Sequence, residues 1–402
     1  MSDEFLRPCL FCQSKNLTDV SEAGKGLRVR ELGRKIDIKL TVCNDCGLLF
    51  QNPLVEKELL QRYLEKHYTG FKNIDLAVER PINQVTCSQR DFLLKHIHYK
   101  PEDPVRLLEI GCYEGDFLRL FADYRWELRG IEPSESGAAY AEKKYGLKID
   151  RSLMEEVEFK PGEYDVIVLR HVLEHILDPG EQIARLYESI SPNGYIYIVV
   201  PNAKTPWISI TNGFFTLEHI THFTIATLGN LLRKAGFEVI AVDDQPNFVE
   251  IRMIGKKVAE KPVFRMSNDR DDILQAIHSY QTERQRLREE VHQRLVGLVA
   301  ESGKTRVVIY GAGGHTEDLL ELFDFSQFHV LGIADKNRSR QGESFYGYEI
   351  IPPEQILALA PDYVIISSYD FQEEIYNAIS YLQDHGIKVV KLYDRVKAFY
   401  YY

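Results

Sequence analysis

The sequence predicts an α/β protein with a small cysteine-containing N-terminal domain and two larger units of alternating strands and helices. Two Cys-x-x-Cys pairs lie within the first 46 residues, and from residue 106 onward short apolar runs alternate with amphipathic segments. Such runs are typical of parallel strands that helices cover on both faces. The chain has 402 residues, more than one hydrophobic core usually serves, so we expect two or three domains.

Composition and charge narrow the classes of function. Hydrophobic residues make up 44% and charged residues 27% of the chain, which is typical of globular proteins and excludes a largely disordered chain. The formal charge of -11 argues against nucleic acid or an anionic membrane as a partner. No apolar stretch approaches the roughly 20 residues that span a bilayer. The N-terminus lacks a signal-like pattern, so we expect a cytoplasmic protein.

The two Cys-x-x-Cys pairs are Cys9 with Cys12 and Cys43 with Cys46. Two such knuckles are typical of a tetrahedral Zn²⁺ site with four thiolates, and a disulfide framework is not expected in a reducing compartment. A closed four-cysteine site is normally structural, so we expect this zinc to hold the domain at residues 1–72 and to do no chemistry. Four unrelated cysteines, or one redox pair, are the alternatives.

The next region, residues 73–258, alternates strand and helix patterns. We expect strands at 106–111, 128–133, 164–170, 194–201 and 237–244, and helices between them at 116–124, 137–146, 180–190 and 226–236. The region at 259–402 opens with a long charged helix at 270–301, most simply a solvated connector and alternatively a dimer element. A second strand–helix series follows it, so we expect a second α/β domain that completes the substrate cleft.

A glycine-rich turn follows the first strand of the central region. It has the pattern E-x-G-x-x-x-G at Glu109, Gly111 and Gly115. Glycines there let the backbone approach a ligand closely, and the next helix offers unpaired N–H groups. The dinucleotide fingerprint is instead G-x-G-x-x-G, and the acidic residues of this turn suit a cationic or zwitterionic ligand. Glu132, at the end of the second strand, can accept both hydroxyls of a ribose.

These motifs resemble those of class I S-adenosylmethionine-dependent methyltransferases. The stretch at 170–179, RHVLEHILDP, at the end of the strand expected at 164–170, is also typical of that superfamily. The resemblance implies a Rossmann-like core that binds S-adenosylmethionine. Glu109, Gly111 and Gly115 would surround the methionine part of this cofactor, and Glu132 would hold its ribose.

The 170–179 stretch allows two interpretations. Arg170 and His171 would line the cofactor pocket by the same analogy. Alternatively, His171, Glu174 and His175 cap a helix and fix the loop.

The loop at 212–224 combines two histidines, a carboxylate and three phenylalanines. It is either a loop packed by aromatic side chains, with Thr224 as the N-cap of the next helix, or an acid/base site at the edge of the cofactor cleft. In the second case Glu218, His219 and His222 are the candidate catalytic residues. Imidazole is the side chain most easily set near a neutral pKa, and a neighbouring carboxylate can orient it.

The whole layout resembles the bacterial sugar C-methyltransferases, with four N-terminal cysteines, a methyltransferase core that carries Glu218-His219 and a C-terminal α/β domain. Those enzymes methylate a ring carbon, commonly C-3, of a nucleotide-linked 4-keto-deoxy sugar. The resemblance implies His219 as the base that forms an enolate, and a nucleotide-linked substrate, most simply dTDP-linked. We expect a monomer or a homodimer.

One position departs from that family's pattern. A tyrosine stands two residues before the glutamate in the family, as Y-x-E-H, whereas this chain has Thr216. His222, Tyr63 and Tyr68 are candidates for a replacement polar group. The departure leaves the acceptor atom open, so transfer to a sugar oxygen or nitrogen remains an alternative.

A second glycine-rich turn, at 311–314, follows a strand in the C-terminal region, and Asp335 closes the next strand. The third fingerprint glycine is replaced by Thr316, and a lone G-x-G is a weak signal. The turn binds a dinucleotide, receives a phosphate of the substrate or only completes the cleft. An NAD-dependent nucleotide-sugar oxidoreductase or isomerase, and a non-catalytic nucleotide-sugar-binding protein, are therefore competing functions.

Overall fold

The computed structural model describes residues 6–29, 34–56, 58–60, 63, 82–210, 213–243, 249–300, 303–369 and 371–394. Its contacts divide the chain into two compact units. Unit 1 contains Met1–Trp207, Asn212–Ser279 and Tyr400–Tyr402, and unit 2 contains Ile208–Thr211 and Tyr280–Phe399. The domain boundary expected at residues 72 and 73 lies outside the described residues.

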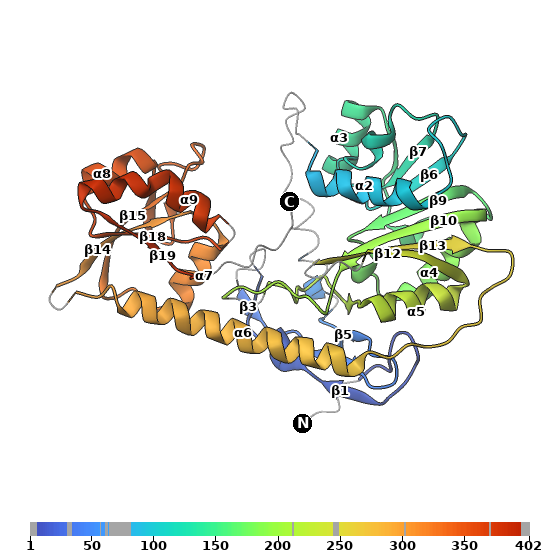
Figure 1. Cartoon of the computed structure of the whole chain (residues 1–402), viewed down its shortest axis with the longest axis horizontal. Helices are drawn as coiled ribbons and strands as arrows, with labels where there is room; N and C mark the ends of the chain where they lie inside the picture. Colours follow the sequence, from blue (N-terminus) through green and yellow to red (C-terminus); the bar gives the residue numbers. More distant parts are fainter. Residues whose placement is uncertain are drawn as a thin grey trace. The chain divides into compact units, whose positions relative to one another are not determined.

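The core of unit 1 is a seven-stranded sheet in the order β12-β13-β10-β9-β6-β7-β8 (Figure 1). Strands β8, β7, β6, β9 and β10 are parallel, and β13 runs antiparallel to β10. The chain forms β6, then β7 and β8 on one side of it, and then crosses to β9 on the other side of β6. The strand order therefore switches between β6 and β9, where α/β sheets bind ligands at their carboxyl ends. The strands are β6 (Arg106–Ile110), β7 (Glu127–Ile131), β8 (Lys148–Asp150), β9 (Tyr164–Arg170), β10 (Ile190–Pro201), β12 (Phe237–Asp243) and β13 (Glu250–Lys257).

Helices cover both faces of this sheet (Figure 1). Val166 of β9 packs in the same apolar cluster as Leu93 of α2, whereas the next residue, Ile167, packs with Ile183 of α4. Because both faces are buried at the centre of the sheet, β9 and β10 contain long apolar runs, VIVL and YIYIVV. The helices are α2 (Gln84–His96), α3 (Glu135–Tyr145), α4 (Pro179–Ser189) and α5 (Ile225–Ala235).

The expected elements of the central region are largely confirmed, with four corrections. Strands β8 and β13 and helix α2 are not among the expected elements. The helix expected at 116–124 is wrong: only a short 3-10 helix, η3 (Leu118–Phe121), forms there. The rings of Phe121 and Trp126 stack with centroids 5.1 Å apart, so the chain after η3 turns back onto the core.

A second, four-stranded sheet in unit 1 has the order β1-β4-β5-β11. Its first three strands lie in the first 51 residues, but its fourth comes from the loop predicted to hold the acid/base site. Thr221 pairs with Phe50, and His222 with Leu49. The cysteine-containing segment is thus built into unit 1. The strands are β1 (Leu17–Asp19), β4 (Leu40–Cys43), β5 (Leu49–Gln51) and β11 (Thr221–His222), and a hairpin of β2 (Leu27–Val29) and β3 (Arg34–Ile36) lies between β1 and β4 in the sequence.

Unit 2 has a six-stranded sheet in the order β16-β17-β15-β14-β18-β19, parallel except for β16. This confirms the second α/β domain and, with the two sheets of unit 1, the predicted fold class. The elements are β14 (Thr305–Tyr310), α7 (Gly314–Leu322), β15 (Phe328–Ala334), β16 (Ser344–Phe345), β17 (Tyr348–Ile351), α8 (Ile356–Leu359), β18 (Tyr363–Ile366), α9 (Gln372–Ile379) and β19 (Lys388–Lys391).

The long charged helix is α6 (Arg270–Val296), which ends five residues earlier than expected. Its first ten residues belong to unit 1 and the rest to unit 2. Among the described helices, none has the length and apolar character that crossing a membrane requires.

Candidate active site and four-cysteine site

Glu109 and Arg170 form a buried ion pair where the strand order switches. Glu109 is the penultimate residue of β6 and Arg170 is the last residue of β9, and these strands are neighbours. The Glu109 carboxylate is 0% exposed, and its Oε1 accepts a hydrogen bond of 2.8 Å from Nε of Arg170. Burial raises the pKa of Glu109, and the Arg170 guanidinium opposes that rise. The pair places fixed charges at the predicted cofactor turn.

The turn after β6 requires glycine at two positions. Gly111 and Gly115 have φ angles of +71° and +79°. A Cβ on Gly111 would lie 2.4 Å from Cγ2 of Val172, and one on Gly115 would lie 2.5 Å from Cδ1 of Leu147. Tyr113, between them, also has a positive φ of 45°. Such a conformation costs a non-glycine residue of the order of 1–3 kcal/mol, and proteins retain it mainly at functional sites.

Glu132 directly follows β7 and is held by the same turn. Its Oε2 accepts the backbone N–H of Tyr113 at 2.8 Å, and its Oε1 accepts that of Ser134 at 2.7 Å. Burial raises the pKa of Glu132, whereas these two N–H groups lower it. Each carboxylate oxygen can accept a further hydrogen bond. The geometry therefore fits a carboxylate that accepts hydroxyl groups.

A buried polar chain leads from this pair toward the histidines. Nη1 of Arg170 donates to Oε1 of Gln89 on α2 at 2.8 Å, and Nε2 of Gln89 donates to Oε2 of Glu250 on β13 at 3.0 Å. Oε2 of Glu250 in turn lies 3.5 Å from Nε2 of His171. Sequence reasoning missed Gln89 and Glu250. The alternation of Glu250 and Arg252 with the apolar residues Ile251 and Met253 was the signal for the second.

Glu174 lies at the centre of a group of histidines. It sits on a short 3-10 helix, η5 (Leu173–His175), and is 1% exposed. Its Oε1 lies 3.5 Å from Nδ1 of His171 and 3.8 Å from Nε2 of His175, and neither of its oxygens has a hydrogen bond within the described part of the chain. Burial raises the pKa of Glu174, but the histidines outweigh it and lower this pKa to about 2.

His171 carries the balancing positive charge. Burial lowers its pKa, but the carboxylates of Glu174 and Glu250 outweigh this and raise it to about 9. Its φ of 53° is a second strained position at the carboxyl ends of the strands. The arrangement is an imidazolium held between two carboxylates, one of which faces the predicted acid/base loop.

His219 and His222 are the buried imidazoles of that loop. The His219 ring centroid lies 5.0 Å from that of His175 and 6.0 Å from that of His222. Nδ1 of His219 and Nε2 of His222 are buried and have no hydrogen-bond partner among the described residues. Burial lowers the pKa of His219, and it lowers that of His222 to about 3. Both rings are therefore neutral near pH 7.

The carboxylate that faces His219 is Glu174. The electrostatic contacts of His219 come from Glu174 and His171, and the N–H of Ile220 donates to the carbonyl of Glu174 at 2.8 Å. Glu218, predicted as the neighbouring carboxylate, has a buried Oε2 with no hydrogen bond among the residues described.

The proposed replacements for the missing tyrosine lie in different places. Thr216, at the family's tyrosine position, has a buried hydroxyl without a hydrogen-bond partner in the described ranges. Of the candidate replacements, His222 lies beside His219, Tyr63 is buried, and Tyr68 lies outside the described residues.

The four cysteines of the two knuckles converge. Sγ of Cys9 lies 3.5 Å from Sγ of Cys46, and Sγ of Cys12 lies 3.5 Å from Sγ of Cys43. All four sulfurs lie within 4.8 Å of one another. A tetrahedral zinc with bonds of about 2.3 Å separates its sulfurs by roughly 3.8 Å, so the donor set and its spacing fit Zn²⁺.

A second group also offers metal-type ligands. The ligand atoms of Glu174, His175 and His219 lie within 4.8 Å of one another. The same three side chains are also suited to proton transfer.

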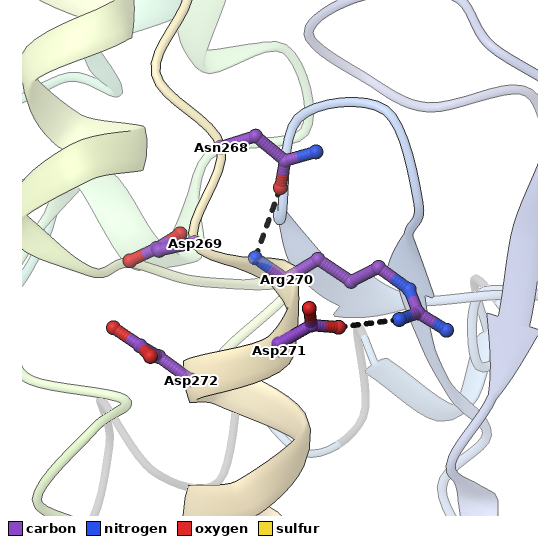
Figure 2. Close-up of a pocket in the computed structure, with 5 residues that line it drawn as sticks. All are labelled: Asn268, Asp269, Arg270, Asp271 and Asp272. Carbon is purple, nitrogen blue, oxygen red and sulfur yellow. Dashed lines mark hydrogen bonds and ion pairs between the residues drawn. The ribbon is translucent and has the colours of Figure 1, made fainter.

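The second knuckle is anchored by the start of α6. The backbone carbonyl of Asn44 accepts a hydrogen bond from Nδ2 of Asn268 at 2.9 Å. The side-chain Oδ1 of Asn44 accepts one from Nε of Arg270 at 2.6 Å. Figure 2 shows the open hollow lined by Asn268–Asp272, in which the Arg270 N–H donates to Oδ1 of Asn268 and the guanidinium pairs with Asp271. Asn268 and Arg270 bind the knuckle, so they serve as its anchor, whereas Asp272 pairs with Lys204.

The glycine-rich turn of unit 2 repeats one feature of the first. Oδ2 of Asp335 accepts the N–H of Ala312 at 2.7 Å, as Glu132 accepts that of Tyr113. Nδ1 of His315, at the start of α7, lies 2.9 Å from the Ser367 hydroxyl oxygen. Burial lowers the pKa of His315 to about 4.

Two regions of the chain match known protein families. Residues 82–242 match a family described as "Methyltransferase domain", and residues 303–390 match "C2185-like, N-terminal". Similar curated proteins include the "Ubiquinone biosynthesis O-methyltransferase" of Thiobacillus denitrificans, 25% identical over 149 residues. The match covers 33% of this chain and 64% of that protein. The protein of the same name from Azorhizobium caulinodans is 26% identical over 170 residues, which cover 37% of this chain and 67% of that protein.

The match thus spans about two thirds of the length of these relatives. Similar solved structures include S-adenosylmethionine-dependent methyltransferases from Mesorhizobium loti and Aquifex aeolicus. They are 15% and 16% identical, cover 42% and 46% of this chain and 96% and 100% of their own, and have TM-scores of 0.35 and 0.36. At these TM-scores they add nothing to the family matches. Residues 82–242, by their family match, form a class I S-adenosylmethionine-dependent methyltransferase domain, and a C2185-like domain follows it.

Proposed function

We propose that this protein transfers a methyl group from S-adenosylmethionine to a ring carbon of a nucleotide-linked deoxy-keto sugar, with His219 as the base. One observation carries the proposal: Nδ1 of His219 is buried and has no hydrogen bond among the described residues, in a ring whose pKa burial lowers. An unbonded nitrogen on a neutral imidazole can take a proton directly from a substrate.

The donor side of the site suits a sulfonium cofactor. Glu109 and Glu132 lie on either side of the turn at 111–115, and this acidic surrounding attracts a positive charge, whereas it would repel a pyrophosphate. When bound, S-adenosylmethionine supplies an electrophilic methyl group. We assign Glu109, Gly111 and Gly115 to its methionine part and Glu132 to its ribose.

The acceptor chemistry follows from a ketone next to the reacting carbon. The ketone acidifies the neighbouring C–H, and His219 takes that proton while the electron pair becomes an enolate. The enolate carbon forms the new C–C bond as the S–CH₃ bond breaks, and S-adenosylhomocysteine leaves. The chain's own part is to position the two reactants and to handle the proton.

Glu174 supports this role of His219. Its carboxylate is ionised at neutral pH, because the histidines hold its pKa near 2. When His219 gains the proton, the resulting imidazolium faces this negative charge in a buried site, which favours proton abstraction. We therefore assign Glu174, in addition to Glu218, to the acid/base group.

The test compares His219→Gln with His222→Gln. We expect His219→Gln to lower turnover of a dTDP-linked 4-keto-deoxy sugar by roughly 10²–10⁴-fold, the usual contribution of a general base. It should leave the affinity for S-adenosylmethionine, measured by calorimetry, unchanged. In deuterated solvent with S-adenosylhomocysteine bound, the wild type should exchange the substrate's acidic C–H and His219→Gln should not. Full turnover by His219→Gln would remove it as base.

A second candidate is transfer to a sugar hydroxyl. Thr216 in place of the family's tyrosine favours it, and the curated relatives are named O-methyltransferases. A hydroxyl acceptor would use the same base. Product NMR distinguishes a C-methyl from an O-methyl or N-methyl group. Separate titrations with S-adenosylmethionine and NAD distinguish methyl transfer from nicotinamide chemistry at the turn at 311–314.

A further inference from the structure

Gln51 connects the four-cysteine sheet to the loop that carries the histidines. It is the last residue of β5 and is 1% exposed. Its side-chain Nε2 lies 2.9 Å from the carbonyl oxygen of His219, 3.0 Å from that of Leu217 and 3.2 Å from that of Thr216. Its backbone N–H donates to the carbonyl of Ile220 at 2.9 Å. Gln51 thus bonds four of the five residues in the segment 216–220, namely Thr216, Leu217, His219 and Ile220.

These contacts hold the backbone of the segment 216–220 at several residues instead of one. The Gln51 amide nitrogen has two hydrogens, which the three carbonyls share. The contacts thereby hold all three carbonyls in a buried region. The segment 216–222, which we call the acceptor loop, continues into β11, where His222 pairs with Leu49 of β5. Strand β5 therefore sets the backbone from which both imidazoles extend.

The same strand is tied to the cysteines. Strand β4 ends at Cys43, whose N–H donates to the carbonyl of Leu48 at 2.9 Å across the turn into β5. The N–H of Gly47 donates to the carbonyl of Cys43, also at 2.9 Å. Since this turn contains Cys43 and Cys46, a metal bound to the sulfurs would fix the geometry of the β4–β5 connection.

We propose that Gln51 is a positioning residue that couples the four-cysteine site to the acceptor loop. The site sets where β5 lies, and the Gln51 amide sets where the carbonyls of Thr216, Leu217 and His219 lie. The position of the His219 imidazole thereby depends on the four-cysteine sheet through Gln51. The proposal rests on the proposed function only in naming His219 as the base.

The test replaces the Gln51 amide with an apolar group of similar shape, as Gln51→Met. The matched control is Asn52→Leu, because Asn52 is the next residue, is 2% exposed and has an amide that bonds Arg7 instead of the loop. Hydrogen exchange of the acceptor-loop amides, S-adenosylmethionine affinity, kcat and KM, and bound zinc are measured for the full-length chain.

We expect Gln51→Met to weaken exchange protection at 217–222 by at least tenfold, whereas Asn52→Leu leaves it unchanged. A displacement of the base by about 1 Å costs of the order of 10²-fold in rate, so kcat should fall by about that factor. Zinc content and S-adenosylmethionine affinity should stay at the wild-type level. Unchanged loop protection in Gln51→Met, or equal loss in both variants, would overturn the proposal.

A third variant covers the case in which Gln51→Met does not fold. Gln51→Glu keeps the shape and donates one hydrogen bond only when its carboxyl is protonated. Loop protection, corrected for intrinsic exchange, should therefore recover as the pH falls, and a pH-independent result contradicts the coupling. The exchange measurements need no acceptor sugar. If no sugar is methylated while the loop responds as expected, the proposed function fails and the coupling stands.

Discussion

At the level of single residues, the buried carboxylate of Glu109 depends on one cationic partner, Arg170. It has no exposed surface, and within the described residues its Oε2 has no hydrogen bond while Oε1 is bonded to Arg170. Removing one partner of a buried pair leaves the other charged group without compensation. The position is therefore sensitive to substitution in a way that the neighbouring surface pairs are not.

We expect Arg170→Met to lower the free energy of unfolding of unit 1 by about 3–5 kcal/mol, because Glu109 would remain buried without its cation. Arg106→Met is the control: its partner is Asp165, its side chain is 41% exposed, and such pairs contribute about 0–1 kcal/mol. Both tryptophans, Trp126 and Trp207, belong to unit 1, so urea unfolding followed by tryptophan fluorescence reports on this unit. Equal losses in the two variants would contradict the assignment.

The pH dependence of methyl transfer should report the lowered pKa of His219. The neutral ring is the active base, so the midpoint of the acid limb of kcat/KM should lie below pH 6.5. Glu174 raises the pKa of His219 against the effect of burial, so Glu174→Gln should move the acid limb to still lower pH. His222→Gln serves as the control and should keep the wild-type limb. An acid limb at or above pH 6.5 in the wild type would speak against His219.

At the level of elements, the turn after β6 combines backbone conformation and packing. Gly111→Ala would place a Cβ 2.4 Å from Cγ2 of Val172 at a positive φ, whereas Gly146→Ala, at the C-cap of α3, has the same sign of φ and open space. The left-handed conformation costs both variants about 1–2 kcal/mol. Only Gly111→Ala has the further cost of overpacking, about 1–3 kcal/mol.

Gly111→Ala should therefore unfold more easily than Gly146→Ala and should bind S-adenosylmethionine more weakly. Thermal unfolding and calorimetry measure the two effects. If the variants lose equal stability and both keep the wild-type affinity, the close approach to Val172 does not constrain the turn.

The elements that sequence reasoning recovered are those with a strong local pattern. The strands at β6, β9 and β10 are apolar runs, and α5 has both its predicted N-cap at Thr224 and its stop at Gly236. Strand β8 is only three residues long, too short for a period to show. The segment at 116–124 carries a helical pattern, but the packing of Phe121 on Trp126 overrides it.

The site residues likewise divide into those that a local sequence pattern identifies and those that it does not. The E-x-G-x-x-x-G turn and Glu132 were found because their spacing is a local property of one strand–turn–helix unit. Gln51, Gln89 and Glu250 were missed, since each acts through partners more than 80 residues away in the sequence. No local pattern identifies such partners, because the sheet topology alone brings them together.

At the level of the whole molecule, the two groups of metal-type ligands make different predictions. If His219 is a base, the purified chain holds one zinc, bound by the cysteines, and His219→Gln keeps it. Cys46→Ser should lower the zinc content and, through β5, increase hydrogen exchange in the acceptor loop while unit 2 is unaffected. Metal analysis and exchange on the full chain measure both. A second ion that disappears in His219→Gln would instead assign Glu174, His175 and His219 to a metal.

The pairing of β11 with β5 also has a consequence for synthesis on the ribosome. Gln51 meets its partners at a sequence separation of 165–168 residues. At 5–20 residues per second, the early strands wait roughly 10–30 s for the last strand of their sheet. During that interval the four thiols have emerged while their sheet still lacks its last strand.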